Sequence, residues 1–272
     1  MICKVKGIPV YYEQYGEGTP VLCIHGYTID HHFMTGCLEP VFNSLDGYKR
    51  IYFDLPGMGK TPSGWIINAD DMLAVVMEFI NAVLPNQNFL IAGDSYGGYM
   101  TLGLLCAMKD RINGALLIAS GIFLDETNRK IPVPERRVLI KDKVFADMEN
   151  NDAVSGFLDV AVIAMPQMFE RYKADCMTGL ELGDKDFLER YRREGYFYSS
   201  EDDLWTLTFD KPTCVLTGRH DHWVGYRDAF ELIDRFPRAT FAVLDCAGHN
   251  LQFEREALFE QHVKDWLWRV EV

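Results

Sequence analysis

The side chains that could carry out chemistry are a serine, a histidine and an aspartate far apart in the chain. Ser95 lies in Gly93-Asp-Ser-Tyr-Gly-Gly98, between a short apolar run and a helical pattern. A serine hydroxyl becomes a good nucleophile only when a base removes its proton and a third group orients that base. His249 and Asp221 could be the base and the orienting acid. The three residues predict nucleophilic attack on a carbonyl carbon.

A turn from strand to helix is needed to present Ser95. Phe89–Ala92 has the length of a buried strand, and Tyr99–Met108 follows a helical pattern. A sharp turn between them would expose the hydroxyl above a helix N-terminus. Gly93 and Gly97 suit such a turn, because a side chain at either position would collide with a neighbouring strand or helix. The pattern G-x-S-x-G alone also fits a turn that only needs a small residue.

The other two side chains follow predicted strands. Asp221 comes after the strand Thr213–Leu216, and His249 comes after the strand Thr240–Leu244. The carboxyl ends of parallel strands lie along one edge of a sheet. We therefore expect both side chains to meet Ser95 at that edge.

Other assignments stay open for the base and the acid. His249 could be a hydrogen-bonded structural histidine, since the chain has seven histidines. Asp125 follows the preceding strand, and Asp228 looks helical and solvated, so both compete with Asp221. We favour Asp221, because the strand before Asp125 ends in Ala119-Ser-Gly121 without a carboxylate.

The order of the elements predicts an α/β domain. Strands that alternate with helices indicate a mostly parallel sheet with helices on both faces. The further predicted strands are Ile2–Lys6, Ile8–Tyr15, Pro20–Ile24, Arg50–Phe53 and Ala115–Ala119. The further predicted helices are Cys37–Asn43, a helix capped by Asn68 that runs to about Leu84, Arg227–Arg235 and Glu254–Val270.

The alternation stops between residues 122 and 207. This segment is helical and charged, and some of its helices carry apolar stripes. We expect residues 1–121 and 208–272 to form the core and residues 122–207 to form an inserted helical cap. A few methionine and aromatic side chains of the cap would line an apolar pocket.

Composition narrows the partners. The 272 residues carry a net charge of −13 without a basic run, which disfavours nucleic acid and anionic membranes. Seven scattered cysteines and an N-terminus without an apolar signal segment predict a cytoplasmic protein with reduced thiols. No apolar stretch reaches the ~18 residues of a membrane span. We expect a small-molecule substrate, and the sequence does not predict the oligomeric state.

Two patterns could suggest a cofactor or a metal. Gly57–Thr61 looks like the end of a phosphate-binding loop, but Asp54 stands where the full pattern needs glycine and Pro56 lacks a donor. The pairs His31-His32 and His220-Asp-His222 lack a third spaced ligand. We therefore expect neither a cofactor nor a metal.

Five motifs together resemble the α/β-hydrolase superfamily, and the resemblance covers essentially the whole chain. They are His25-Gly26-Tyr27, Asp54-Leu-Pro-Gly-Met-Gly59, Gly93–Gly98, Gly218-Arg-His-Asp221 and Gly248-His249. The resemblance implies an eight-stranded sheet, a cap and the catalytic triad Ser95–Asp221–His249. It also implies an oxyanion hole made by the backbone N–H groups of Tyr27 and Tyr96. Tyr96 is a suitable donor, because the first N–H groups of a helix have no intrahelical acceptor.

The resemblance implies a serine hydrolase, and we expect it to cleave a small, largely apolar ester through an acyl-enzyme. His25, Gly26, Gly93 and Gly97 would support the site. Alternatives are a carbon–carbon bond hydrolase of ring-cleavage products, a ligand-binding member with little turnover, and an acyl transferase. Haloalkane dehalogenases and epoxide hydrolases carry an aspartate at the nucleophile position, which is Ser95 in this chain, so both are excluded. Asp94 lies one residue before that position, and we expect its side chain to point elsewhere. Proline iminopeptidases typically carry Gly-Gly-Ser-Trp-Gly, from which this sequence departs.

Overall fold

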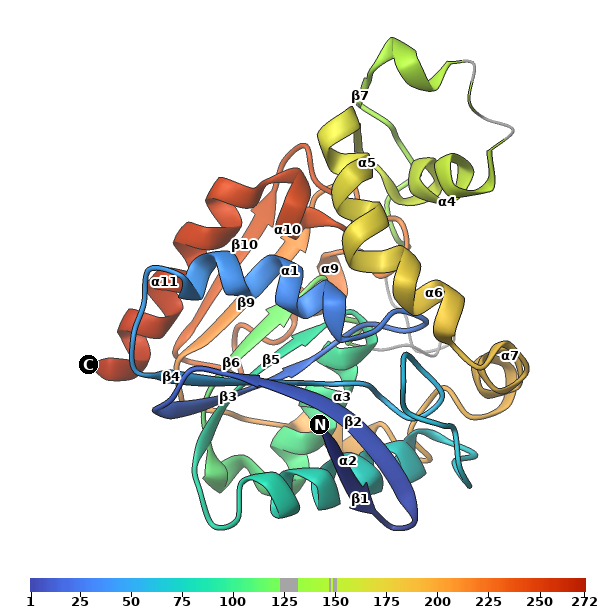
Figure 1. Cartoon of the computed structure of the whole chain (residues 1–272). Coiled ribbons are helices and arrows are strands. Elements are labelled where there is room, and N and C mark those ends of the chain that lie inside the picture. The colour runs from blue at the N-terminus through green and yellow to red at the C-terminus, as the bar shows by residue number, and fades with distance from the viewer. Residues whose placement is uncertain (123–131, 147, 149–150) are drawn as a thin grey trace.

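A central eight-stranded sheet organises the computed structural model, which describes residues 1–122, 132–146, 148 and 151–272. The strand order is β1-β2-β4-β3-β5-β6-β9-β10 (Figure 1). The β1–β2 and β2–β4 pairs are antiparallel, and the remaining pairs are parallel. This confirms the predicted mostly parallel sheet. The strands are β1 (Ile2–Val5), β2 (Ile8–Tyr15), β3 (Thr19–Ile24), β4 (Tyr48–Phe53), β5 (Phe89–Asp94), β6 (Ile112–Ile118), β9 (Thr213–Gly218) and β10 (Ala239–Leu244).

The central strands are mostly apolar because helices cover both faces of the sheet. In β3, Val21 and Cys23 pack into one apolar cluster, while Leu22 and Ile24 pack into the other. This alternation follows from the two-residue period of a strand. All six residues of β5 are buried, which places the residue that follows it at the centre of the sheet.

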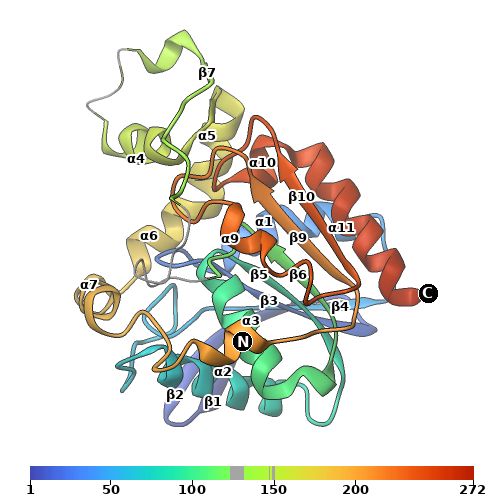
Figure 2. The same ribbon diagram turned by 180° about the vertical axis from the view of Figure 1, so that it is seen from behind.

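Two helices cover each face. α1 (His31–Phe42) and α11 (Glu256–Glu271) lie on one face, and α2 (Ala69–Val83) and α3 (Tyr96–Met108) lie on the other (Figures 1 and 2). The predicted cap of α2 is confirmed, since the Asn68 side chain accepts a hydrogen bond from the N–H of Asp71. None of the described helices is long and apolar enough to cross a membrane.

Two helices differ most from the prediction. α1 begins at His31 rather than Cys37, because Asp30 caps it by accepting a hydrogen bond from the N–H of His32. α9 (Arg227–Phe230) is shorter than predicted. Beyond Phe230 the backbone N–H groups bond to carbonyls three residues back, which continues the chain as tight turns rather than as an α-helix.

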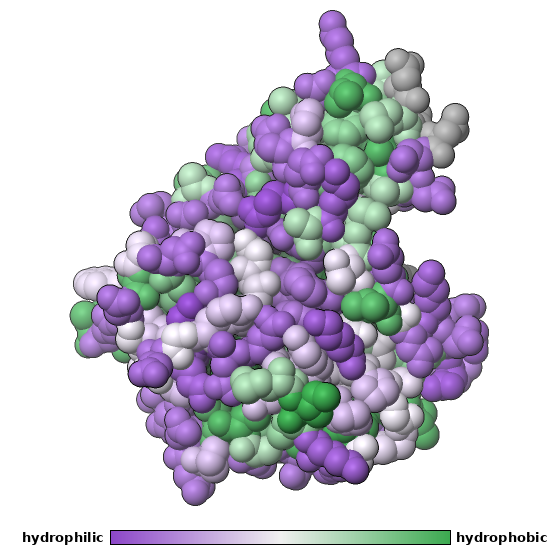
Figure 3. Space-filling view, viewed as in Figure 1, coloured by the Kyte–Doolittle hydropathy of each residue, from purple (hydrophilic) through white to green (hydrophobic). Residues whose placement is uncertain are grey.

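The segment between β6 and β9 contributes helices and two short paired strands. They are β7 (Ile140–Lys141), α4 (Asp152–Val160), β8 (Ile163–Ala164), α5 (Pro166–Tyr172), α6 (Thr178–Leu182), α7 (Lys185–Glu194) and α8 (Asp202–Thr206). The helical turn Lys173–Met177 packs on α1, so this inserted segment lies above the sheet edge (Figure 1). Around β7 it exposes apolar side chains such as Leu139 and Ile140. Figure 3 shows hydrophobic surface on this upper part of the molecule.

Candidate active site

The three candidate side chains lie at the same edge of the sheet. Ser95 directly follows β5, Asp221 lies three residues beyond β9, and His249 lies on the loop after β10. Ser95 Oγ lies 2.9 Å from His249 Nε2, and His249 Nδ1 lies 2.9 Å from Asp221 Oδ2. With the ring proton on Nδ1, the hydroxyl donates to the imidazole and the imidazole donates to the carboxylate. The structure thus brings all three together.

Ser95 lies in the strained turn that the sequence suggests. Its φ of 50° is in the left-handed region, which a non-glycine residue rarely adopts. Its N–H donates to the carbonyl of Ile118, and its own carbonyl accepts from Gly98. A Cβ at Gly97 would meet the carbonyl oxygens at the end of β3, so only glycine lets the start of α3 approach that strand.

Burial and neighbouring charges set the protonation of the acid and the base. Burial alone would raise the pKa of Asp221, but His249 and the N–H groups of Trp223 and Val224 outweigh it and lower the pKa. Burial alone would lower the pKa of His249, but the nearby carboxylates, Asp221 foremost, raise it. The pair therefore stabilises the imidazolium that forms when the ring takes the serine proton.

Two backbone N–H groups are free to bind an oxyanion beside Ser95. Tyr96 is the first residue of α3, and Tyr27 lies on the loop after β3. Neither N–H has an acceptor within the described part of the chain. These are the two donors that the sequence analysis expects in an oxyanion hole, and that role stays a prediction.

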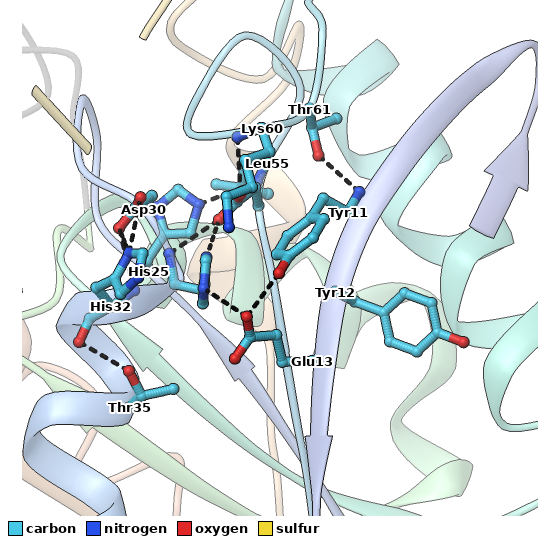
Figure 4. A network of polar contacts seen from close by, with 12 residues as sticks. Tyr11, Tyr12, Glu13, His25, Asp30, His32, Thr35, Leu55, Lys60 and Thr61 are labelled. Atoms are coloured by element: carbon cyan, nitrogen blue, oxygen red, sulfur yellow. Dashed lines mark hydrogen bonds and ion pairs between the residues drawn. The ribbon is translucent and has the colours of Figure 1, made fainter. Parts of the chain in front are cut away.

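His25 holds the loop that carries Tyr27. Its Nε2 accepts a hydrogen bond from the N–H of Leu55 at 3.0 Å (Figure 4). Its Nδ1 donates to the carbonyl of Gly26 at 2.7 Å. Burial lowers the pKa of His25. Both ring nitrogens are therefore used by a neutral imidazole, which ties the loop after β3 to the loop after β4.

A cavity of about 580 Å³ opens at Ser95 and His249. Its walls come from the sheet edge and from the inserted segment. The apolar lining residues include Ile29, Phe33, Val160, Leu180, Trp223 and Val224. The volume is within the usual range of small-molecule sites.

The match to known proteins agrees with this arrangement. A family described as "alpha/beta hydrolase fold" matches residues 19–256. The chain belongs to the α/β-hydrolase fold family.

Individual relatives of this α/β hydrolase have different activities. It is 23% identical over 227 residues to a 2-hydroxy-6-oxononadienedioate/2-hydroxy-6-oxononatrienedioate hydrolase of Paraburkholderia phymatum, covering 81% of this chain and 77% of that protein. An α/β superfamily hydrolase from Oenococcus oeni PSU-1 has a TM-score of 0.89 at 27% identity, with 97% of both chains covered. A thermophilic esterase from Thermogutta terrifontis has a TM-score of 0.71 at 18% identity, covering 100% of this chain and 99% of that chain.

Asp94 lies differently from the sequence expectation. We expected its side chain to point elsewhere, but in this α/β hydrolase it is only 1% exposed and lines the same cavity as Ser95. Its Oδ1 has no hydrogen-bond partner among the described residues. Burial raises the pKa of Asp94 to about 8. The expectation was wrong because β5 continues through Asp94, so this side chain still projects from the sheet just before the turn.

The structure describes one of the two competing acids. Asp228 is helical, as predicted, but it is buried rather than solvated, since it lies on α9 against the core. Asp125 lies outside the described residues. In the described part of the chain, Asp221 is the carboxylate that bonds to His249 Nδ1.

Glu254 is a supporting residue that the sequence analysis missed. Its Oε2 accepts from the N–H of Gly248 at 2.7 Å, and its Oε1 accepts from the N–H groups of Val162 at 2.6 Å and Ile163 at 3.1 Å. The carboxylate is buried in the short helix α10 (Leu251–Glu254). It therefore fixes the residue before His249 against the inserted segment.

Tyrosines join the inserted segment to the loop after β3. The Tyr196 ring stacks on Tyr96 with centroids 4.7 Å apart and meets the edge of Tyr27 at 4.9 Å. Tyr27 donates to the carbonyl of Leu188 at 2.5 Å, and the Tyr96 and Tyr191 hydroxyls lie 2.5 Å apart. The sequence predicted a role only for the backbone N–H groups of Tyr27 and Tyr96. It gave no signal for these side-chain contacts.

Asp54 organises a polar network beside the site. Its carboxylate accepts from the N–H and Nδ1 of His31 at 2.9 and 2.7 Å and from the N–H of Lys60 at 2.8 Å. The network extends to Glu13, which accepts from the hydroxyl of Tyr11 (Figure 4). The loop Gly57–Thr61, which resembles the end of a phosphate-binding loop, is thus held at Asp54 through the backbone N–H of Lys60.

One group of side chains has the composition of a metal site. Asp30, His31 and His32 each offer a ligand atom within 4.8 Å of the others. His32 Nδ1 bonds to Asp30 and His31 Nδ1 bonds to Asp54. His31 Nε2 has no hydrogen-bond partner among the described residues and lies 3.4 Å from Glu13 Oε1. The group caps α1 and anchors it to the Asp54 network.

Proposed function

We propose that this chain is a serine hydrolase that cleaves small, largely apolar esters through an acyl-enzyme. The observation that supports the proposal is the chain of hydrogen bonds from Ser95 Oγ through His249 to the buried carboxylate of Asp221. Such a chain of hydrogen bonds can activate a hydroxyl that would otherwise be a poor nucleophile.

In this mechanism His249 takes the proton of Ser95 as the hydroxyl oxygen attacks the ester carbonyl. The developing oxyanion accepts hydrogen bonds from Tyr27 N–H and Tyr96 N–H, each worth on the order of 3 kcal/mol to the transition state. His249 then protonates the leaving alcohol, and the acyl group stays on Ser95. Water, deprotonated by His249, cleaves the acyl-enzyme and restores the serine. Asp221 stabilises the imidazolium in both halves of the reaction.

The cavity supports a preference for short to medium acyl chains. Its volume is about 580 Å³, and Phe33, Val160 and Leu180 contribute apolar surface. Since α4–α7 supply part of the wall, we assign residues 122–207 as a cap that sets the shape of the pocket. All seven cysteines are unpaired, which fits a cytoplasmic place of action.

The proposal is tested with p-nitrophenyl acetate, butyrate, octanoate and palmitate. We expect the highest kcat/KM on butyrate or octanoate and at least roughly a 10³-fold loss of kcat in Ser95→Ala. Ser44→Ala, at an exposed serine just after α1, is the matched control and should keep full activity. A preference for palmitate would refute the small pocket, and unchanged activity of Ser95→Ala would refute the mechanism.

A carbon–carbon bond hydrolase is the second candidate. The Paraburkholderia relative is named as such a hydrolase of an oxo acid, and the cavity wall includes the charged residues Asp159 and Arg192. Arg192 lies 4.1 Å from the ring centroid of Tyr196, at the exposed mouth. Faster turnover of a 2-hydroxy-6-oxo-dienoate than of any ester in the panel would favour this candidate.

A further inference from the structure

Asp94 is a buried polar side chain in the cavity wall, and the proposed mechanism does not use it. It is 1% exposed, and its Oδ1 has no hydrogen-bond partner among the residues that the structure describes. A buried polar oxygen without a partner costs about 1–3 kcal/mol of stability. Such a group in a cavity wall indicates a partner that arrives with a ligand.

The position of the carboxyl group relates it to the scissile carbonyl. A Cβ built on Gly26 would lie 2.8 Å from Asp94 Oδ2 and 3.2 Å from the Cβ of Ser95. The carboxyl and the nucleophile therefore converge beside Gly26, directly before the loop residue Tyr27. A substrate held at Ser95 in this cavity would therefore also lie next to the Asp94 carboxyl.

The surroundings of Asp94 favour its neutral form. The titratable groups that face it are His249 and Asp221 at the sheet edge, Cys37 on α1 and Cys176 on the turn Lys173–Met177. Burial raises the pKa of both cysteine thiols well above their ordinary value, so they stay neutral near pH 8. Burial also holds the Asp94 proton on the carboxyl at neutral pH, with a pKa of about 8.

We propose that Asp94 is a substrate-binding residue, whose neutral carboxyl donates a hydrogen bond to an uncharged acceptor atom next to the scissile carbonyl. This rests on the proposed function and narrows its substrate class to esters with an ether, keto or hydroxyl oxygen at that position. An ionised Asp94 would lose the donor and would also place a negative charge near the developing oxyanion. The preference should therefore disappear as Asp94 ionises.

The test compares p-nitrophenyl methoxyacetate with p-nitrophenyl butyrate, which differ by one oxygen in place of a methylene. The readout is the ratio of their kcat/KM values in the parent and in two variants, so intrinsic reactivity cancels. Asp94→Asn keeps a donor and cannot ionise, whereas Asp94→Leu has no donor. At pH 7 we expect this ratio to be unchanged in Asp94→Asn and to fall roughly tenfold in Asp94→Leu.

The pH dependence gives a second readout that does not need the Leu variant to fold. The ratio should fall in the parent as the pH rises through about 8 and should stay constant in Asp94→Asn. A ratio that is independent of pH in the parent, or unchanged in a folded Asp94→Leu, overturns the role of Asp94 alone. Turnover of neither ester, or turnover that survives Ser95→Ala, overturns the proposed function and this inference with it.

Discussion

Replacing Asp221 by asparagine removes the charge behind His249 and leaves the shape of the site. The asparagine oxygen can still accept from the N–H groups of Trp223 and Val224, which bond to Asp221 Oδ1 at 2.9 and 3.0 Å. The lost partner is the imidazolium, whose Nδ1 lies 2.9 Å from Asp221 Oδ2.

The magnitude follows from Coulomb's law. Two unit charges at that separation attract by about 6 kcal/mol at an effective dielectric constant of about 20. Since each 1.36 kcal/mol changes a rate tenfold, the variant should lose roughly 10⁴-fold in kcat. The loss should be in kcat rather than in KM, because the imidazolium forms only during the reaction.

The assay is steady-state hydrolysis of p-nitrophenyl butyrate, with thermal unfolding to show that the variant is folded. Asp245→Asn is the matched control, because Asp245 also faces a histidine, with 3.2 Å between its Oδ1 and His220 Nε2. Its side chain is 77% exposed, and it does not take part in the hydrogen bonds that join Asp221, His249 and Ser95. The control should keep its activity, and a folded Asp221→Asn within tenfold of the parent would refute the reasoning.

Three further predictions concern the supporting residues. Glu254→Ala leaves three buried backbone N–H groups without an acceptor, so urea unfolding should show a loss of about 3 kcal/mol or more, and Glu254→Gln a smaller one. Gly26→Ala places a methyl 2.8 Å from Asp94 Oδ2, so kcat/KM should fall at least tenfold while circular dichroism stays unchanged. Asp94 keeps its proton to about pH 8 when folded but releases it near pH 4 when unfolded, so stability falls as pH rises. Asp94→Asn lacks this loss, and its free energy of unfolding relative to the parent should increase between pH 5 and pH 8.

The sequence predicts the sheet well because the sheet is a local pattern. The predicted strand Thr213–Leu216 differs from β9 (Thr213–Gly218) only at its end, and buried apolar runs need no distant information. The start of α1 was missed because its first turn carries two histidines, whose partners Asp30 and Asp54 become visible only in the folded chain.

The environment of the candidate site is less accessible to sequence reasoning. The order of Ser95, Asp221 and His249 after successive strands suffices to place them at one edge. Glu254, however, acts on the N–H of Val162, 92 residues away. Asp94 was expected to point elsewhere because it lies one residue before the nucleophile. The sequence alone does not show that its side chain lines the cavity.

The most direct test of a nucleophilic Ser95 is covalent labelling of the folded protein by a fluorophosphonate. The account predicts one probe per chain, attached to the peptide that contains Ser95, and no attachment in Ser95→Ala. Labelling in Asp221→Asn should be slower by a factor similar to its loss in kcat. A folded protein that takes up no probe, or that carries it on another residue, would contradict the account.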